Sequence, residues 1–345
     1  MPRSHSIRLG ATLGVFLLLL HAGCEADVSP LVGEDRYYSL YGVLNPRTDT
    51  QTVVVFPIES TLRTLPEESL DARFTSVEQE TGQTVVWQDS ILSTEQGAVH
   101  VFWAPFQAQF GSAYELNVER SDGATSSVSL QVPPEAAFEI GPATLGPPVT
   151  QTVFVRPDVE RLAQVRVTYV VRALIPPNIF RGSPDLIADE RPPGGPGTGP
   201  PPPPDSLVVQ TANARFDYTE FADLGGSEWA LEIDLGGDFR EIRDAIRARA
   251  RFDLGYGIQI DGIFLSVVVA NEAWNPPGGT FDPDVLIQPG TMSNVEQGFG
   301  FVGAGYPMEI FWLPPQDILE RAGFSFTDLP TDPPDDDGPN PDDPS

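Results

Sequence analysis

The stretch YELNVERSDGATSSVSLQV, residues 114–132, decides the fold that the sequence predicts. Apolar residues in its first part alternate with polar ones, at Tyr114, Leu116 and Val118. This period of two indicates a β-strand with one buried face. The pair Asp122-Gly123 follows, and such a pair favours a tight turn between antiparallel strands because glycine tolerates a positive φ. We therefore expect a β-hairpin here.

Strand-like runs of the same kind precede this hairpin at roughly ten-residue spacing, with turn signals such as Thr81-Gly82 between them. They are residues 37–44, 51–58, 70–79, 83–88 and 98–104. The pattern Tyr-x-Leu-x-Val, a turn and a last strand resembles the closing hairpin of immunoglobulin and fibronectin-type β-sandwiches, in which Tyr114 would be the corner tyrosine. We expect residues 37–134 to form one such sandwich.

Residues 135–327 are expected to form a second β-rich domain, less regular than the first. Its strand-like runs are 150–157, 163–174, 206–210, 228–235 and 257–274. A proline-rich insertion at 192–204 favours extended polyproline II, which lacks the donors that a sheet needs. We interpret it as a surface loop between strands, and the alternative is a ligand for a protein groove. The predicted fold class is therefore mainly β.

One amphipathic helix is expected at 238–252, in DFREIRDAIRARARF. Asp238 would cap its N-terminus, and Glu241 would complete a capping box. Phe239, Ile242 and Ile246 form an apolar stripe that would pack on a sheet.

Basic residues recur along one side of this predicted helix, at Arg240, Arg243, Arg247 and Arg251. They form the only basic cluster in a very acidic chain, and we treat them as candidates for binding an acidic partner. The alternative is a solvated face, in which Glu241 and Asp244 pair locally with the arginines and arginines near the C-terminus complement the helix dipole.

The acidic composition of the chain indicates the ionic environment in which the protein works. The chain holds 49 acidic and 20 basic residues, all of the latter arginine, for a formal net charge of −29. Concentrated salt screens the repulsion within such a surface, so this pattern favours a halophilic, salt-adapted protein. The alternative is an ordinary acidic secreted protein from a GC-rich genome. Nucleic acid is excluded as a partner in either case, because phosphate binding requires a basic face.

The leader predicts where the protein works. Residues 1–23 combine early arginines with a short apolar run, as a signal peptide does, and the run is too short to span a bilayer. Leu20-His21-Ala22-Gly23-Cys24 resembles a bacterial lipobox, although His21 departs from it. Cys24, the only cysteine, would then carry the acyl chains, palmitate among them, and residues 24–36 would form a tether. The alternative is a conventionally cleaved or uncleaved signal with an incidental cysteine.

Little in the sequence points to an enzyme. The mature chain has one histidine, His100, in a strand-like run, and no Gly-x-Ser-x-Gly motif. Paired carboxylates capable of glycan hydrolysis are not singled out by any pattern. Trp274 and Trp312 are candidates for stacking on a sugar, with core packing as the alternative. Residues 328–345 are too acidic and proline-rich to build a core, and we expect a disordered tail.

The segment SNVEQGFGFVGAG, residues 293–305, contains a Gly-x-Gly-x-x-Gly pattern. A dinucleotide site is excluded because the pattern opens no helix after a strand. The segment resembles the closing motif of a family of uncharacterised Bacteroidetes outer-membrane lipoproteins, a domain of unknown function. Six residues match that motif: Asn294, Val295, Gly298, Gly300, Gly303 and Ala304.

The resemblance implies a β-rich, two-part lipoprotein of the outer membrane, often associated with TonB-dependent receptors, and it supplies no catalytic residue to carry over. We expect no cofactor. Three functions remain open. The first is a non-enzymatic accessory or binding subunit of an outer-membrane receptor or uptake system. The second is a glycan-binding surface lipoprotein, and the third is a carboxylate-based glycan hydrolase.

Overall fold

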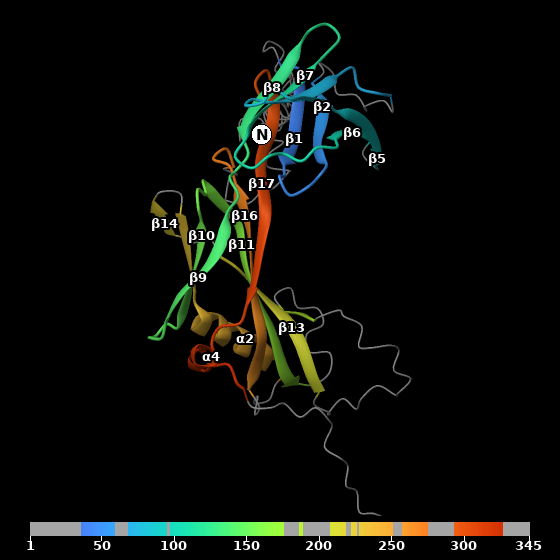
Figure 1. The fold of residues 1–345 in the computed structure, drawn as a ribbon. Helices are drawn as coiled ribbons and strands as arrows, with labels where there is room; N and C mark the ends of the chain where they lie inside the picture. Colours follow the sequence, from blue (N-terminus) through green and yellow to red (C-terminus); the bar gives the residue numbers. More distant parts are fainter. Residues whose placement is uncertain are drawn as a thin grey trace, which may run out of the picture. The chain divides into compact units, whose positions relative to one another are not determined.

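The computed structural model describes residues 36–58, 68–94, 97–175, 186–188, 208–218, 222–225, 228–250, 257–274 and 293–326. These residues form seventeen strands and two helices, which confirms the mainly β prediction. The strands belong to three sheets (Figure 1). The lipidation candidate Cys24, the proline-rich insertion and the acidic tail lie outside the described residues.

The largest sheet has nine strands, in the order β12-β13-β11-β16-β17-β1-β2-β6-β5. Its strands are β1 (Tyr38–Leu44), β2 (Gln51–Pro57), β5 (Gln88–Thr94), β6 (Gly97–Ala104), β11 (Arg161–Ile175), β12 (Leu186–Ala188), β13 (Val208–Asp217), β16 (Ile258–Ala270) and β17 (Gly298–Trp312). The β1–β17 pair is parallel, and the other neighbours in this sheet are antiparallel.

Two four-stranded sheets complete the fold. One has the order β4-β3-β7-β8, and the other has the order β14-β15-β10-β9. The first contains β3 (Arg73–Glu78), β4 (Thr84–Val86), β7 (Ala113–Glu119) and β8 (Thr125–Gln131). The second contains β9 (Ala137–Thr144), β10 (Thr150–Arg156), β14 (Ala222–Gly225) and β15 (Glu228–Ile233).

The hairpin predicted from residues 114–132 is confirmed as the antiparallel pair β7–β8. Gly123 has the positive φ, 89°, that the turn requires. Tyr114 is buried, and its hydroxyl accepts a hydrogen bond from the Gln109 N–H at 3.0 Å. This bond to backbone a few residues upstream is the contact expected of a corner tyrosine.

The core of the first β-sandwich draws on more of the chain than residues 37–134. Strands β1, β2, β3, β6, β7 and β8 supply most of it. Val295, Val302 and Ala304, from the end of the chain, are buried in the same core. The first seven residues of β17 pair with β1, and its last eight pair with β16 (Figure 1). One strand therefore belongs to both predicted halves.

Glycines let β17 lie against β1. At Gly300, φ is +93°, and an added Cβ would lie 2.2 Å from the Leu40 carbonyl oxygen. At Gly298, an added Cβ would lie 2.4 Å from the Tyr38 carbonyl oxygen. Real Cβ atoms do not approach backbone this closely, so the Gly-x-Gly part of the motif is required by strand packing.

Asn294 fixes the start of the same segment. Its side-chain amide donates to the Val302 carbonyl at 2.7 Å, and its side-chain oxygen accepts from the Val302 N–H at 3.0 Å. These two bonds are those that a neighbouring strand would make with Val302. The packing of β17 thus explains five of the six motif residues: Asn294, Val295, Gly298, Gly300 and Ala304.

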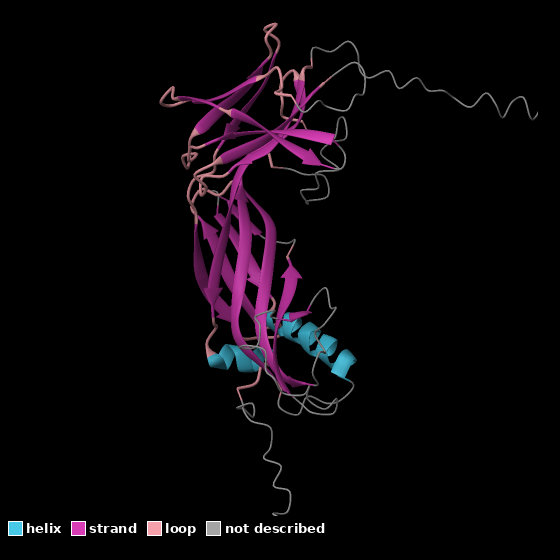
Figure 2. Ribbon diagram, turned by 90° about the vertical axis from the view of Figure 1, so that its right-hand side faces the viewer, coloured by secondary structure: helices cyan, strands magenta, loops and turns pink. Residues whose placement is uncertain are grey.

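A second core is built by strands β10, β11, β13, β15 and β16, by the second part of β17 and by two helices, α2 (Leu235–Ala250) and α4 (Gln316–Ala322). Phe239, Ile242 and Ile246 of α2 are buried in it, as the apolar stripe predicts. Leu319 and Ala322 of α4 face the same core, and both helices lie close together against it (Figure 2). The sequence reading did not predict α4.

Candidate functional site

Helix α2 carries the arginines predicted to bind a partner, and it starts one turn earlier than predicted. The Gly237 N–H donates to the Asp234 carboxylate at 2.8 Å, so Asp234 caps the helix. The prediction that Asp238 is the N-cap is wrong, because Asp238 lies in the first turn. Glycine is unfavourable inside a helix, yet the Asp234 cap and the burial of Leu235 stabilise a first turn that contains Gly236 and Gly237.

Asp238 instead joins α2 to the sheet. Its Oδ2 accepts hydrogen bonds from the Tyr169 hydroxyl at 2.5 Å and the Tyr218 hydroxyl at 2.6 Å. Tyr169 lies in β11, and Tyr218 directly follows β13. Asp238 is 8% exposed, so both hydroxyls satisfy a carboxylate that is nearly removed from water.

Burial raises the pKa of the Asp238 carboxyl from 3.8 to about 6. The two tyrosine hydroxyls act in the opposite direction, and the nearby charge of Asp234 raises the pKa further. Burial also raises the pKa of Tyr169 well above its usual range, so both tyrosines stay protonated donors at neutral pH. The cluster holds α2 in place, and no local sequence pattern predicts it because its members are far apart in the chain.

Replacing Asp238 with asparagine should change how stability depends on pH. A raised carboxyl pKa means that the folded state binds the proton more tightly than the unfolded state. The contribution of Asp238 to the free energy of unfolding is therefore fully present below about pH 4 and lost as pH rises through about 6. A shift of about two units corresponds to about 3 kcal/mol.

We expect the free energy of unfolding of the natural protein, relative to Asp238→Asn, to fall by about 3 kcal/mol between about pH 3.5 and about pH 8. Denaturant titrations at several pH values measure this difference. The other acidic residues titrate in both proteins, so their contributions cancel. Parallel pH profiles for the two proteins would contradict the assigned role of Asp238.

The outer face of α2 carries the predicted cations. Arg240 and Arg247 are exposed, and Arg243 is half-buried. A guanidinium nitrogen of Arg243 lies 3.1 Å from the Asp244 carboxylate, as the alternative of local pairing predicted for this helix. Arg251 lies outside the described residues. The structure thus places three of the four arginines on a helix, and two of them, Arg240 and Arg247, are exposed.

The two tryptophans predicted to stack on sugar have different positions. Trp274 is 5% exposed, and its ring packs against Phe301 with centroids 5.8 Å apart. A ring without an open face does not stack on a ligand, so the prediction for Trp274 is wrong, and its core alternative holds. Trp312 is half-buried and packs against the second core. Among the residues that the structure describes, its indole N–H is a buried donor without a hydrogen-bond partner.

His100 is buried in β6, and its Nδ1 lies 3.0 Å from the Asp89 carboxylate in β5. Asp89 also accepts the Leu70 N–H at 3.0 Å. The pair joins two neighbouring strands and a loop, which agrees with the structural role predicted for His100. In the described ranges, no three potential metal ligands gather.

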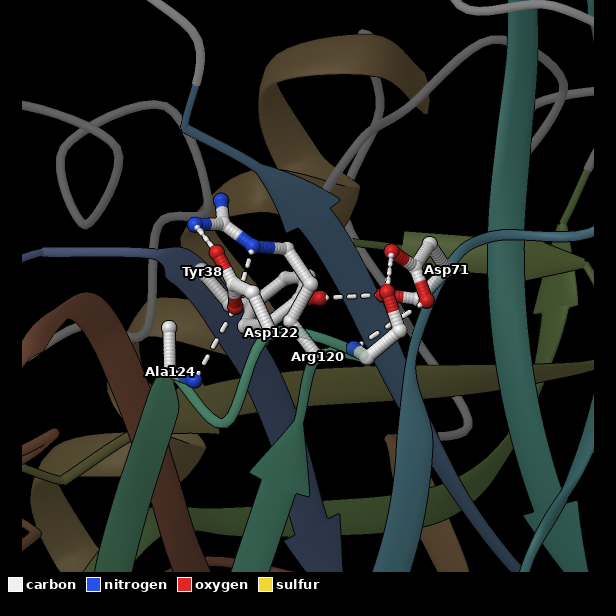
Figure 3. Close-up of polar contacts among 6 residues, drawn as sticks. Tyr38, Asp71, Arg120, Asp122 and Ala124 are labelled. Atoms are coloured by element: carbon white, nitrogen blue, oxygen red, sulfur yellow. Dashed lines mark hydrogen bonds and ion pairs between the residues drawn. The ribbon is translucent and has the colours of Figure 1, made fainter.

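A polar network surrounds the β7–β8 turn (Figure 3). Arg120 donates two hydrogen bonds to Asp122, at 2.9 and 2.5 Å, and the Ala124 N–H donates to the same carboxylate. The Arg120 bonds hold the pKa of Asp122 at about 2. The Tyr38 hydroxyl donates to the Asp71 carbonyl at 2.5 Å. These hydrogen bonds stabilise the conformation of the β7–β8 turn.

Comparison with known proteins finds no relative that indicates a function. No protein-family model matches the chain, and no curated protein matches it. Two solved structures are weakly similar. A pullulanase from Anoxybacillus is 12% identical, with a TM-score of 0.21, over 73% of this chain and 28% of its own. A mutant of a Salmonella alpha-2-macroglobulin is 12% identical, with a TM-score of 0.23, over 84% of this chain and 16% of its own.

The chain therefore spans under a third of either protein, and such TM-scores carry no argument about function. Within the described part of the chain, no helix is long and apolar enough to cross a membrane.

Proposed function

We propose that this protein is a non-enzymatic lipoprotein of the cell envelope, anchored through Cys24, which binds a protein partner through the exposed arginines of α2. The single observation that carries the binding surface is the position of Arg240 and Arg247. Both stand exposed on a helix whose other face is fixed in the core, in a chain with a formal net charge of −29.

The fixed position of α2 supports a binding role. Asp234 caps it, Asp238 bonds it to two tyrosines, and its apolar stripe is buried. A surface that is already ordered loses little conformational entropy on binding. Arginine also suits this role, because its planar guanidinium bonds carboxylates through two donors at once.

The charge distribution of this chain would orient an acidic partner as well as attract it. An acidic partner is repelled by most of this chain and attracted by the arginines of α2, which sets how the two proteins meet. In concentrated salt the range of such forces shrinks to a few ångströms, so the attraction acts at contact. The resemblance of residues 293–305 to outer-membrane lipoproteins supports a TonB-dependent receptor as the partner.

Charge reversal on α2 tests the proposal. We expect Arg240→Glu/Arg247→Glu to lower the partner recovered with the protein from gently solubilised membranes at least about tenfold, because like charges would face each other at the contact. Arg73→Glu/Arg215→Glu is the matched control, since it removes two exposed arginines, on β3 and β13, with the same change in net charge. Equal losses in both variants, or none in either, would argue against α2 as the contact.

A further inference from the structure

Two aromatic side chains lie exposed on the outer face of the large sheet. Phe264 of β16 is 41% exposed, and Phe311 of β17 is 54% exposed. They are directly paired across the two strands, with ring centroids 4.7 Å apart and an interplanar angle of 46°. The neighbours of Phe264 in sequence, Ile263 and Leu265, are fully buried, so this pair faces away from the second core.

Gly262 makes room for one of these rings. A Cβ added at Gly262 would lie 2.0 Å from the Phe311 ring. The ring therefore covers the glycine backbone, in the space that any side chain would occupy. This arrangement fixes Phe311 against the sheet while more than half of its surface stays open to solvent.

A charged pair includes Asp261, the residue directly before Gly262, whose backbone the Phe311 ring covers. The pairing of β11 with β16 is irregular between Val170 and Val171, and Asp261 is the extra residue there. Such bulges re-aim side chains. The Asp261 carboxylate lies 2.7 Å from a guanidinium nitrogen of Arg172, with the two side chains 36% and 43% exposed. The surface thus offers apolar ring faces next to an acceptor and a donor fork.

We propose that Phe264, Phe311, Asp261 and Arg172 form a binding site for neutral carbohydrate. A pyranose has an apolar C–H face that stacks on an aromatic ring, and hydroxyl groups at its edge that bond carboxylate and guanidinium. Charge selects this occupant among those that fit an exposed aromatic surface. The Asp261 carboxylate at the site repels an anionic ligand at contact, but not a neutral sugar.

This site goes beyond the proposed protein contact, because it lies on the sheet face opposite the core that holds α2 and uses none of its arginines. It also differs from the tryptophans predicted for stacking. The exposed rings are phenylalanines, and both lie in parts of β16 and β17 where buried residues alternate with more exposed ones.

Ligand-observed saturation-transfer NMR tests the site, with methyl β-D-glucopyranoside, methyl β-D-galactopyranoside and N-acetylglucosamine as probes. The full chain is used in concentrated salt, with probe concentrations that detect millimolar dissociation constants. We expect saturation of ring C–H protons of at least one probe. Phe264→Ser/Phe311→Ser should reduce it at least tenfold, while Val86→Ser/Leu92→Ser, which replaces exposed apolar side chains elsewhere, should leave it unchanged.

Asp261→Asn keeps both rings and guards against a phenylalanine variant that fails to fold. It should weaken the signal several-fold, because the amide accepts fewer hydrogen bonds from hydroxyls than the carboxylate does. The proposal is overturned if the natural protein transfers no saturation to any of the three probes. It is equally overturned if the signal survives in folded Phe264→Ser/Phe311→Ser.

Discussion

Gly300→Ala should destabilise the protein by about 4 kcal/mol or more, enough to prevent folding of a marginally stable chain. Two effects combine at this position. Its φ of +93° is strained for any residue with a side chain, and the new Cβ would lie 2.2 Å from the Leu40 carbonyl oxygen. The clash is with backbone, so relief requires that β1 and β17 move apart.

Gly82→Ala separates these two effects. Gly82 also has a positive φ, +70°, but an added Cβ would meet nothing within 4 Å. Only the backbone strain remains, and we expect a loss of about 1 kcal/mol. Denaturant unfolding followed by circular dichroism compares the two variants. Similar losses at both positions would contradict the assignment of Gly300 to close β1–β17 contact.

Cys24→Ser should move nearly all of the protein from the membrane fraction to the soluble fraction. Each buried methylene contributes about 0.8 kcal/mol, and anchoring becomes stable with two or more acyl chains. A serine at this position carries no thioether-linked lipid, and no other cysteine is present to replace it. Fractionation of cells, followed by the intact mass of the recovered protein, measures both location and modification.

Ala26→Ser provides the matched control, since it makes a similarly small change two residues away. We expect that variant to stay in the membrane fraction with the acyl mass. The soluble Cys24→Ser protein should keep the thermal stability of the natural protein. Retention of Cys24→Ser in the membrane at the natural level would contradict the anchor, and so would an unmodified Cys24 in the natural protein.

Local sequence patterns predicted much of the fold. Alternation and turn residues predicted β7, β8 and the turn at Gly123. In a half-buried hairpin, the alternation of apolar and polar residues along each strand shows which face is buried. The apolar stripe of α2 was also predicted from local spacing. The N-terminus of the helix was not, because Asp238 bonds two tyrosines that are distant in sequence, which leaves Asp234 as the cap.

The pairing of strands that are distant in sequence could not be predicted from local patterns. No local pattern predicts a strand at residues 298–312, although residues 293–305 resemble a family motif. Their glycines weaken strand propensity taken alone, and they become favourable only when β1 lies alongside. Trp274 was misjudged for the same reason, because its burial depends on Phe301 in β17.

Of the two candidate surfaces, local sequence patterns predict one and not the other. Spacing alone placed Arg240 and Arg247 on one side of a helix, and the structure leaves both exposed. The pair of Phe264 and Phe311 needed the register of β16 with β17, which no local pattern specifies.

The most direct test of the proposed binding role is photo-crosslinking in intact cells, with a photoreactive amino acid in place of Arg240. The account predicts one predominant adduct with an outer-membrane protein, which mass spectrometry would identify. The same amino acid at Arg215, an exposed position on β13, should give no such adduct. No adduct from position 240, or the same adducts from both positions, would contradict the proposal that α2 is the docking surface.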